Sequence, residues 1–475
     1  MTNVDGAPRD DAESRSWEER VVHSPDGRFA HRPREVLVPA DQAEQARSII
    51  QESFGADVET VSDDVAGFVL LRGDFQPLLV VDELRAARIT ALPNHVYFAH
   101  SCGCAGSCPP HPSSWAGCAQ SGHTAFGYGY AGWSAHGDPF SSNPFSSNPF
   151  SSNPFSSNPS EFGLAGVTPG GLWRQTGRRR SSARPAPVPH PQPVAGEAGA
   201  EPPGAEVVVL DTGLLGVATA RPTLLPETWA GDRDDVPDHD RDTFLDPVAG
   251  HGTFIAGLIA EYAPSCTVRV RGIVTNLGDT DEEQVAKALQ ALYGRVDFVN
   301  MSFSSYSPLA PEGPVAAAVR RLQREPSPAG SRSSAPRDEQ GAVVVASAGN
   351  DATCLPTYPA ALPGVVSVGA IGPSGPAPFT NYGRWVRACA PGVDLVSTFF
   401  SGFDGPEVSA PGQPDPDRFD GWARWSGTSF SAPIVVACLA RTVYRTGCSP
   451  RQAVAQLIDA PGLGAMPWLG TVVNP

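Results

Sequence analysis

The stretch Arg424-Trp425-Ser426-Gly427-Thr428-Ser429-Phe430-Ser431-Ala432-Pro433 contains a serine placed where a helix is expected to begin. A proline is tolerated in the first turn of a helix, where its missing N–H is not needed, so Pro433 predicts a helix start near Ser429. Unpaired backbone N–H groups at such a start favour a developing negative charge. A serine hydroxyl attacks only when a base removes its proton, so the stretch requires a histidine and a carboxylate elsewhere.

A histidine stands at the start of a second predicted helix. His251 lies in the run Gly250-His251-Gly252-Thr253-Phe254-Ile255-Ala256-Gly257, whose apolar side chains continue at helical spacing through Tyr262. The flanking glycines allow other backbone to approach closely. The pattern predicts that His251 opens a buried helix.

A carboxylate ends a short β-branched run. Val207-Val208-Val209-Leu210-Asp211 has the composition of a central parallel strand, which is buried on both faces. Asp211 is therefore expected at the carboxyl end of that strand, the edge where open α/β sheets carry their sites.

Asp211, His251 and Ser429, in this order along the chain, resemble the subtilisin family of serine peptidases. A further segment, Val343-Val344-Val345-Ala346-Ser347-Ala348-Gly349-Asn350, predicts a buried strand followed by an amide, similar to the family's oxyanion-hole asparagine. The resemblance implies that Asn350 and the backbone N–H of Ser429 stabilise the oxyanion, a donor of this type being worth roughly 100- to 1000-fold in rate.

The resemblance also implies a substrate-binding wall. Val299-Asn300-Met301-Ser302-Phe303 is similar to the family's strand beside the first specificity pocket, although the family usually continues with two glycines where this chain has Ser304 and Ser305. The implied substrate-binding residues are Ser302, Phe303, Ser304, Ala348 and Gly349.

Each motif has an ordinary interpretation when it is taken alone. A buried histidine near a helix start is usually a hydrogen-bonded core residue, and Gly-Thr-Ser is common in loops. Asp-Thr-Gly is also the aspartic-peptidase signature, but that class needs two copies and residues 211–213 supply one. Four motifs in family order favour the peptidase.

The chain has 475 residues, 49 of them glycine and 49 proline, which indicates two domains and much linker. For 205–475 the resemblance implies a subtilisin-like three-layer α/β fold, with a central parallel sheet flanked by helices. Residues 34–100 alternate strand-like and helical patterns in the order β-α-β-β-α-β, which predicts a small ferredoxin-like α+β domain. Its place before the larger domain is similar to that of the family's inhibitory propeptide, with an unrelated accessory domain as the alternative. Residues 1–33 are expected to be disordered.

Residues 101–204 predict a low-complexity linker. Pro139-Phe140-Ser141-Ser142-Asn143 is followed by three identical pentapeptides, a period that matches neither helix nor strand. A spacer and a repeated recognition or cleavage site are both open. The same segment contains Cys102, Cys104, Cys108 and Cys118 with His111 and His123 nearby, for which zinc binding, disulfides and free thiols remain alternatives.

The net charge of −16 argues against nucleic acid as a partner. The start of the sequence has no apolar signal-peptide core and no stretch is apolar enough to span a membrane, so we expect a cytoplasmic protein, with non-standard export as the alternative. The acidic run 232–242 predicts a solvated loop, with structural calcium or contact with basic substrates as alternatives. No cofactor is expected to be needed for chemistry, and the oligomeric state is left open.

The predicted function is that of a zymogen-like serine endopeptidase acting on a peptide or protein substrate through Asp211, His251 and Ser429 and an acyl-enzyme, with self-processing in the linker. The alternatives are a maturation peptidase dedicated to one partner peptide and a catalytically silent peptide-binding scaffold.

Overall fold

The computed structural model describes residues 20–99, 185–188, 204–215, 230–239, 241, 243, 245–404 and 418–475. The repeats, the segment from 101 to 184 and its four clustered cysteines lie outside these residues. No helix among the described residues is long and apolar enough to cross a membrane.

A mainly parallel sheet forms the centre of the larger domain. Its strand order is β18-β19-β15-β13-β12-β11-β7-β9-β8, with β14 paired to β13. Pairing is parallel from β19 to β8 and antiparallel at β18 and β14. The strands are β7 (Glu206–Asp211), β8 (Ala230–Gly231), β9 (Thr267–Gly272), β11 (Phe298–Met301), β12 (Val343–Ser347), β13 (Val366–Gly372), β14 (Gly375–Pro376), β15 (Ala388–Pro391), β18 (Ala465–Met466) and β19 (Gly470–Val472).

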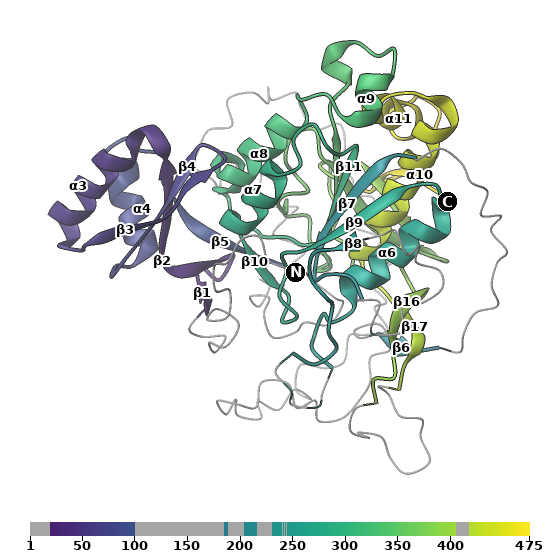
Figure 1. Ribbon diagram of the computed structural model, residues 1–475, viewed down its shortest axis with the longest axis horizontal. Helices are drawn as coiled ribbons and strands as arrows, with labels where there is room; N and C mark the ends of the chain where they lie inside the picture. The colour runs from purple at the N-terminus through teal and green to yellow at the C-terminus, as the bar shows by residue number, and fades with distance from the viewer. Residues whose placement is uncertain are drawn as a thin grey trace, which may run out of the picture. The chain divides into compact units, whose positions relative to one another are not determined.

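Helices cover both faces of this sheet, as the α/β prediction requires (Figure 1). One core cluster joins the sheet to α6 and α10, and a second joins its other face to α7 and α8. The helices are α6 (His251–Tyr262), α7 (Glu282–Gln290), α8 (Pro314–Leu322), α9 (Pro328–Arg332), α10 (Thr428–Thr446) and α11 (Pro450–Leu457), with short 3-10 turns η4 (Ala310–Glu312) and η5 (Arg337–Glu339). The three-layer prediction is confirmed.

The N-terminal domain has the predicted element order. Its antiparallel strands pair in the order β5-β2-β4-β3, with β1 beside β2. Its elements are β1 (Val22–His23), β2 (Ala30–Pro39), η1 (Ala40–Gln42), α3 (Ala43–Phe54), β3 (Val58–Val65), β4 (Phe68–Gly73), α4 (Pro77–Ala86) and β5 (Leu92–Phe98).

Two domain limits differ from the sequence-based expectation. Disorder was expected through residue 33, but Arg20 is buried and β2 begins at Ala30, because the arginines of this segment form ion pairs with the larger domain. Within the expected linker, β6 (Ala186–Pro187) pairs with β17 (Asp420–Trp425), which in turn pairs with β16 (Leu395–Ser401). A short piece of the linker is therefore part of the larger domain.

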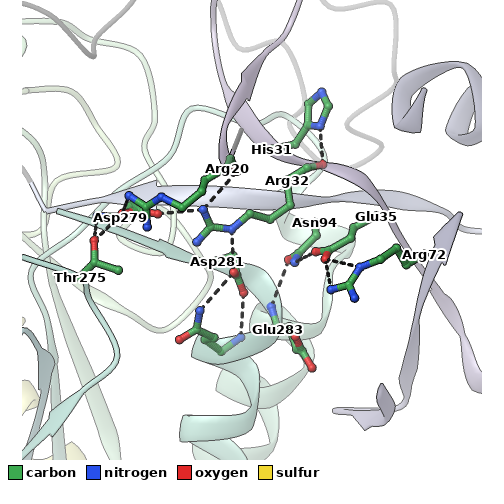
Figure 2. A network of polar contacts seen from close by, with 11 residues as sticks. Arg20, His31, Arg32, Glu35, Arg72, Asn94, Thr275, Asp279, Asp281 and Glu283 are labelled. Carbon is green, nitrogen blue, oxygen red and sulfur yellow. Dashed lines mark hydrogen bonds and ion pairs between the residues drawn. The ribbon is translucent and has the colours of Figure 1, made fainter. Parts of the chain in front are cut away.

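A strand of the larger domain extends the N-terminal sheet. The strand β10 (Asp279–Asp281) pairs antiparallel with β5, so the sheet continues from one domain into the other. Beside this joint, Arg32 donates to Asp279 Oδ2 at 2.8 Å and to Asp281 Oδ2 at 2.9 Å, and Arg20 donates to Asp279 Oδ1 at 3.2 Å (Figure 2).

Candidate active site

The predicted acid and base lie together because of two adjacent elements. Asp211 ends β7 and His251 begins α6, and His251 Nδ1 is 2.7 Å from Asp211 Oδ1 with both side chains fully buried. The approach of the two elements requires glycine, because a Cβ on Gly252 would lie 2.3 Å from the carbonyl oxygen of Gly213. The carboxylate therefore fixes the orientation of the imidazole ring.

The other ring nitrogen of His251 is not used by the pair with Asp211. His251 Nε2 is buried and has no hydrogen-bond partner among the described residues. The ring packs against Trp425 at 5.5 Å and Phe430 at 5.3 Å between centroids. These aromatic neighbours hold the imidazole in place on the side of α10, the helix that carries Ser429.

Ser429 is the second residue of α10, at the helix N-terminus as predicted. The prediction for Pro433 is wrong in one respect, because the helix begins at Thr428 and the proline lies beyond its first turn. A proline inside a helix leaves the carbonyl four residues earlier without its N–H partner, and that carbonyl belongs to Ser429. Here Ser302 Oγ donates to it instead, at 2.9 Å.

Ser302 is thus a direct neighbour of the candidate nucleophile. Ser302 Oγ donates to the Ser429 carbonyl oxygen, and the Ser302 carbonyl oxygen lies 3.5 Å from Ser429 Oγ. Asn300 Nδ2 donates to Ser302 Oγ at 3.0 Å and so helps to orient it. The last part of β11 and the residue that follows it therefore support Ser429, the second residue of α10.

The predicted oxyanion residue also contacts the start of α10. Asn350 Oδ1 accepts from the backbone N–H of Thr428 at 2.9 Å and from its hydroxyl at 2.8 Å. Because these bonds fix the oxygen side of the amide, the orientation of the nitrogen side is fixed as well. Asn350 is therefore held within one residue of Ser429.

Three predicted wall residues surround the same place, and β5 of the N-terminal domain runs along them. Ser304 exchanges two backbone hydrogen bonds with Phe98, each 2.9 Å long. Phe303 packs edge-on against Tyr97 at 5.8 Å. The Ala99 N–H donates to the Gly278 carbonyl at 2.8 Å on the opposite side. The serine at 304 thus forms the backbone pairs despite replacing a glycine of the family pattern.

The last two predicted wall residues have supporting contacts. The Ala348 carbonyl accepts from Thr357 Oγ1 and Asn381 Nδ2, both at 2.9 Å. Gly349 has φ +101°, and a Cβ there would lie 2.5 Å from Asn381 Nδ2. These residues hold the loop that leads to Asn350.

The sequence did not identify Asp235 as part of this site. It belongs to the acidic run expected to be solvated, yet it is fully buried and accepts from the Gly250 N–H, Thr212 Oγ1 and Thr253 Oγ1 at 3.0 to 3.2 Å. Burial raises its pKa to about 7, although these hydrogen bonds act in the opposite direction. Asp235 thus links Thr212, which follows Asp211, to Gly250, which precedes His251. In the sequence, only the hydroxyls of Thr212 and Thr253 hinted that a buried acceptor lies nearby.

Other acids of the run hold backbone groups. Asp232 accepts from the Gly272 N–H, and Asp238 from the Thr243 N–H. Among the described residues no group of three or more histidine, cysteine, aspartate or glutamate side chains is arranged to bind a metal ion. Calcium binding was an alternative to the solvated loop for this run, and no observation here tests it.

The cysteines of the larger domain are not all alike. Cys266, Cys389, Cys438 and Cys448 are free thiols, whereas Cys354 is disulfide-bonded. Disulfides persist in oxidising compartments and are rare in the cytoplasm, so the disulfide at Cys354 disagrees with the expected cytoplasmic location.

Comparison with known proteins agrees with the motifs. A family model described as the subtilase family matches residues 203–460. A thermostable alkaline protease of Halalkalibacterium halodurans is 28% identical over 255 residues, which cover 51% of this chain and 58% of the relative. A thermophilic serine proteinase of Bacillus sp. (strain AK1) is 36% identical over 123 residues, covering 25% of this chain and 26% of the relative. The chain thus spans only part of the length of these relatives.

Two solved structures are also similar to this chain. A cold-adapted subtilisin-like serine proteinase is 19% identical with a TM-score of 0.41, covering 57% of this chain and 89% of its own. A lanthipeptide protease is 23% identical with a TM-score of 0.41, covering 57% and 85%.

Proposed function

This chain belongs to the subtilase family, and from that premise we propose that it is a serine endopeptidase that cleaves its own chain after the N-terminal domain. The observation that carries the proposal is the fully buried His251–Asp211 pair at 2.7 Å, next to the helix start that bears Ser429. The aromatic packing of His251 and the contacts of Asn350 with Thr428 support the same assignment.

We propose the following roles for these residues, which the His251–Asp211 pair and the contacts of Asn350 support. His251 Nε2 removes the proton of Ser429 Oγ as this oxygen attacks a peptide carbonyl, while Asp211 stabilises the imidazolium that forms. Asn350 and the Ser429 N–H donate to the oxyanion. His251 then protonates the leaving amine, and water hydrolyses the acyl-enzyme with the same base.

The course of β5 supports self-processing. Its end lies between the Ser304 backbone on one side and Gly278 on the other, paired to each as an added strand. Recognition of an extended peptide by such pairing leaves the side chains to determine specificity. The N-terminal domain would therefore occupy the groove as a bound substrate or product and block other peptides.

The register suggests which bond is cleaved. Phe98 stands opposite Ser304, and the two strands of an antiparallel pair run in opposite directions. A peptide bound in this register would therefore present to Ser302 the residue two positions after the one opposite Ser304. Ser302 is the wall residue in contact with Ser429. We therefore assign the scissile bond to His100–Ser101, two residues that lie outside the described ranges.

The test compares intact masses of the wild-type protein and its Ser429→Ala variant after equal incubation, together with labelling by a serine-directed phosphonate. We expect fragments 1–100 and 101–475 from the wild type only, and a phosphonate adduct on Ser429. Labelling of Ser429 with cleavage elsewhere in 101–204 would support the peptidase activity but contradict the assignment of the scissile bond. No labelling and no cleavage would favour the peptide-binding scaffold. Labelling without self-cleavage would favour a peptidase dedicated to one partner peptide.

A further inference from the structure

The groove beside the site contains a polar group that the mechanism does not use. We propose that Glu282 makes the pocket now filled by Tyr97 selective for tyrosine, so that the enzyme prefers peptides with tyrosine as the fourth residue before the scissile bond (P4). This inference rests on the proposed function, including the cleavage after residue 100.

The hydroxyl of Tyr97 is recognised by one carboxylate oxygen. Tyr97 OH donates to Glu282 Oε2 at 2.5 Å, and both side chains are fully buried. Burial and the neighbouring Glu282 charge raise the pKa of Tyr97 well above its usual value. The phenol therefore remains a donor, which is the partner that a carboxylate requires.

The body of the tyrosine ring has an apolar environment. Its ring meets Phe303 edge-on, and it belongs to the core cluster that includes Val285, Ala310 and Val315. The pocket thus combines apolar sides with one carboxylate at the position of the hydroxyl. Such a site can distinguish tyrosine from phenylalanine, because phenylalanine would leave a desolvated acceptor without a donor.

Glu282 is held by its own domain and does not depend on Tyr97 for its position. It is the first residue of α7, and its other oxygen, Oε1, accepts from the Val315 N–H at 3.1 Å. A Cβ on Gly313 would lie 2.5 Å from the same oxygen, so the side chain packs closely against the start of α8. The carboxylate should therefore keep its place after the N-terminal domain has left.

A substrate would present its own side chain to this pocket in the same register. Tyr97 pairs with Thr280 through the antiparallel β5–β10 ladder, which uses backbone groups that every peptide has. A peptide that replaces β5 and is cleaved at the same bond would place its P4 residue where Tyr97 lies now.

The distribution of charged partners favours tyrosine over a basic residue. The arginines of the N-terminal domain bind Asp279 and Asp281, the flanking acids of β10 (Figure 2). Among the described residues, Glu282 Oε2 contacts the phenol of Tyr97 and lies 3.5 Å from His95 Nδ1. The other ring nitrogen of His95, Nε2, lies 2.6 Å from Ser307 Oγ. A lysine at P4 would have to bury its ammonium among the apolar walls.

The experiment uses the full-length protein after incubation and two peptides that release a reporter amine. One carries the chain's own residues 96–100, Val-Tyr-Phe-Ala-His, and the other has phenylalanine at P4. A third peptide with lysine at P4 tests the basic alternative. Glu282→Gln keeps the side-chain shape and an oxygen for the Val315 N–H. Glu283→Gln is the matched control, because the Glu283 carboxylate is paired with Lys287 and not with Tyr97.

We expect kcat/KM to be about 10- to 100-fold higher for tyrosine than for phenylalanine with the wild type and with Glu283→Gln. With Glu282→Gln the ratio should fall below about 5-fold, since the amide is a weaker partner. Equal rates for tyrosine and phenylalanine, or the highest rate for lysine, would overturn the inference, as would an unchanged ratio in Glu282→Gln.

The same samples separate this inference from the proposed function. Phosphonate labelling of Ser429 with cleavage of all the peptides at similar rates would preserve the peptidase and reject the tyrosine subsite. Absence of both labelling and cleavage would reject the two together. The tyrosine and phenylalanine peptides differ only at P4 and are both tested on the wild-type protein. Their comparison is therefore valid even if Glu282→Gln fails to fold.

Discussion

Two regions of this molecule contain buried carboxylates, and the partners of these carboxylates differ between the regions. Beside the candidate catalytic pair Asp211–His251, Asp235 receives neutral donors from its own domain, and burial raises its pKa to about 7. At the domain joint, burial also acts to raise the pKa of Asp279, yet Arg32 and Arg20 leave it lowered. The first arrangement is internal to one domain, whereas the second depends on cations supplied by the other.

The difference indicates which region can be taken apart. If the N-terminal domain leaves, water can solvate Asp279 and Asp281, since buried charges are costly only while they are desolvated. Asp235 cannot exchange its partners without disturbing residues next to Asp211 and His251. We expect the joint to be separable and the catalytic region to be indivisible.

The largest effect should come from Asp211→Asn. The substitution keeps the shape but favours the wrong imidazole tautomer, so kcat should fall by about 10,000-fold. Peptide hydrolysis and urea unfolding would both be measured for the wild type and for Asp211→Asn. A fall in activity with unchanged unfolding of the N-terminal domain would separate the two regions, whereas a fall of less than about 10-fold would contradict the role of Asp211.

Asp235 provides a test through pH. Its folded pKa of about 7 is above the usual value of 3.8, so the protonated form favours the fold. The stabilisation is complete below about pH 4 and is lost as pH rises to about 7, a change of about 4 kcal/mol. Urea unfolding of Ser429→Ala with and without Asp235→Asn would measure it. Parallel pH profiles for both proteins would show that Asp235 does not titrate in this window.

Asn350→Ala should lower kcat by roughly 100- to 1000-fold with little change in KM, because the lost donor acts on the transition state. Steady-state kinetics with one peptide would suffice. A loss that falls mainly on KM would mean that Asn350 positions the substrate and that another group stabilises the oxyanion.

The smallest effect should come from Arg32→Met at the joint. Asp281 would lose its arginine, but Asp279 would keep Arg20, so we expect the Ser429→Ala protein to lose about 2 kcal/mol of stability. Arg34→Met is the control, because Arg34 and its partner Asp74 are largely exposed. Equal losses in the two variants would remove the contrast between the regions.

Local patterns were enough to predict the elements that carry the candidate catalytic residues. The β-branched run before Asp211, the apolar periodicity after His251 and the run before Asn350 are each observed as β7, α6 and β12. These signals lie within one element, where side-chain spacing reflects burial directly. The element order of the N-terminal domain was predictable for the same reason.

Contacts between distant elements were beyond local patterns. Nothing in the acidic run distinguishes Asp235 from its exposed neighbours, because its partners are two threonine hydroxyls and one backbone N–H that only the fold brings near. The pairing of β10 with β5 depends on residues far apart in the chain. The limit of disorder at residue 33 was wrong because Arg20 and Arg32 find their acids in the other domain.

The hydroxyl of Ser302, bonded to the carbonyl that Pro433 leaves without a helical partner, has a consequence for engineering. Ser302 belongs to the proposed peptide-binding wall and also contacts Ser429, the proposed nucleophile. Under the proposed function, a change at Ser302 should therefore alter both substrate affinity and turnover. Substitutions in the wall and at the start of α10 should be non-additive. A substitution of Ser302 made to change peptide binding should therefore also change the environment of Ser429.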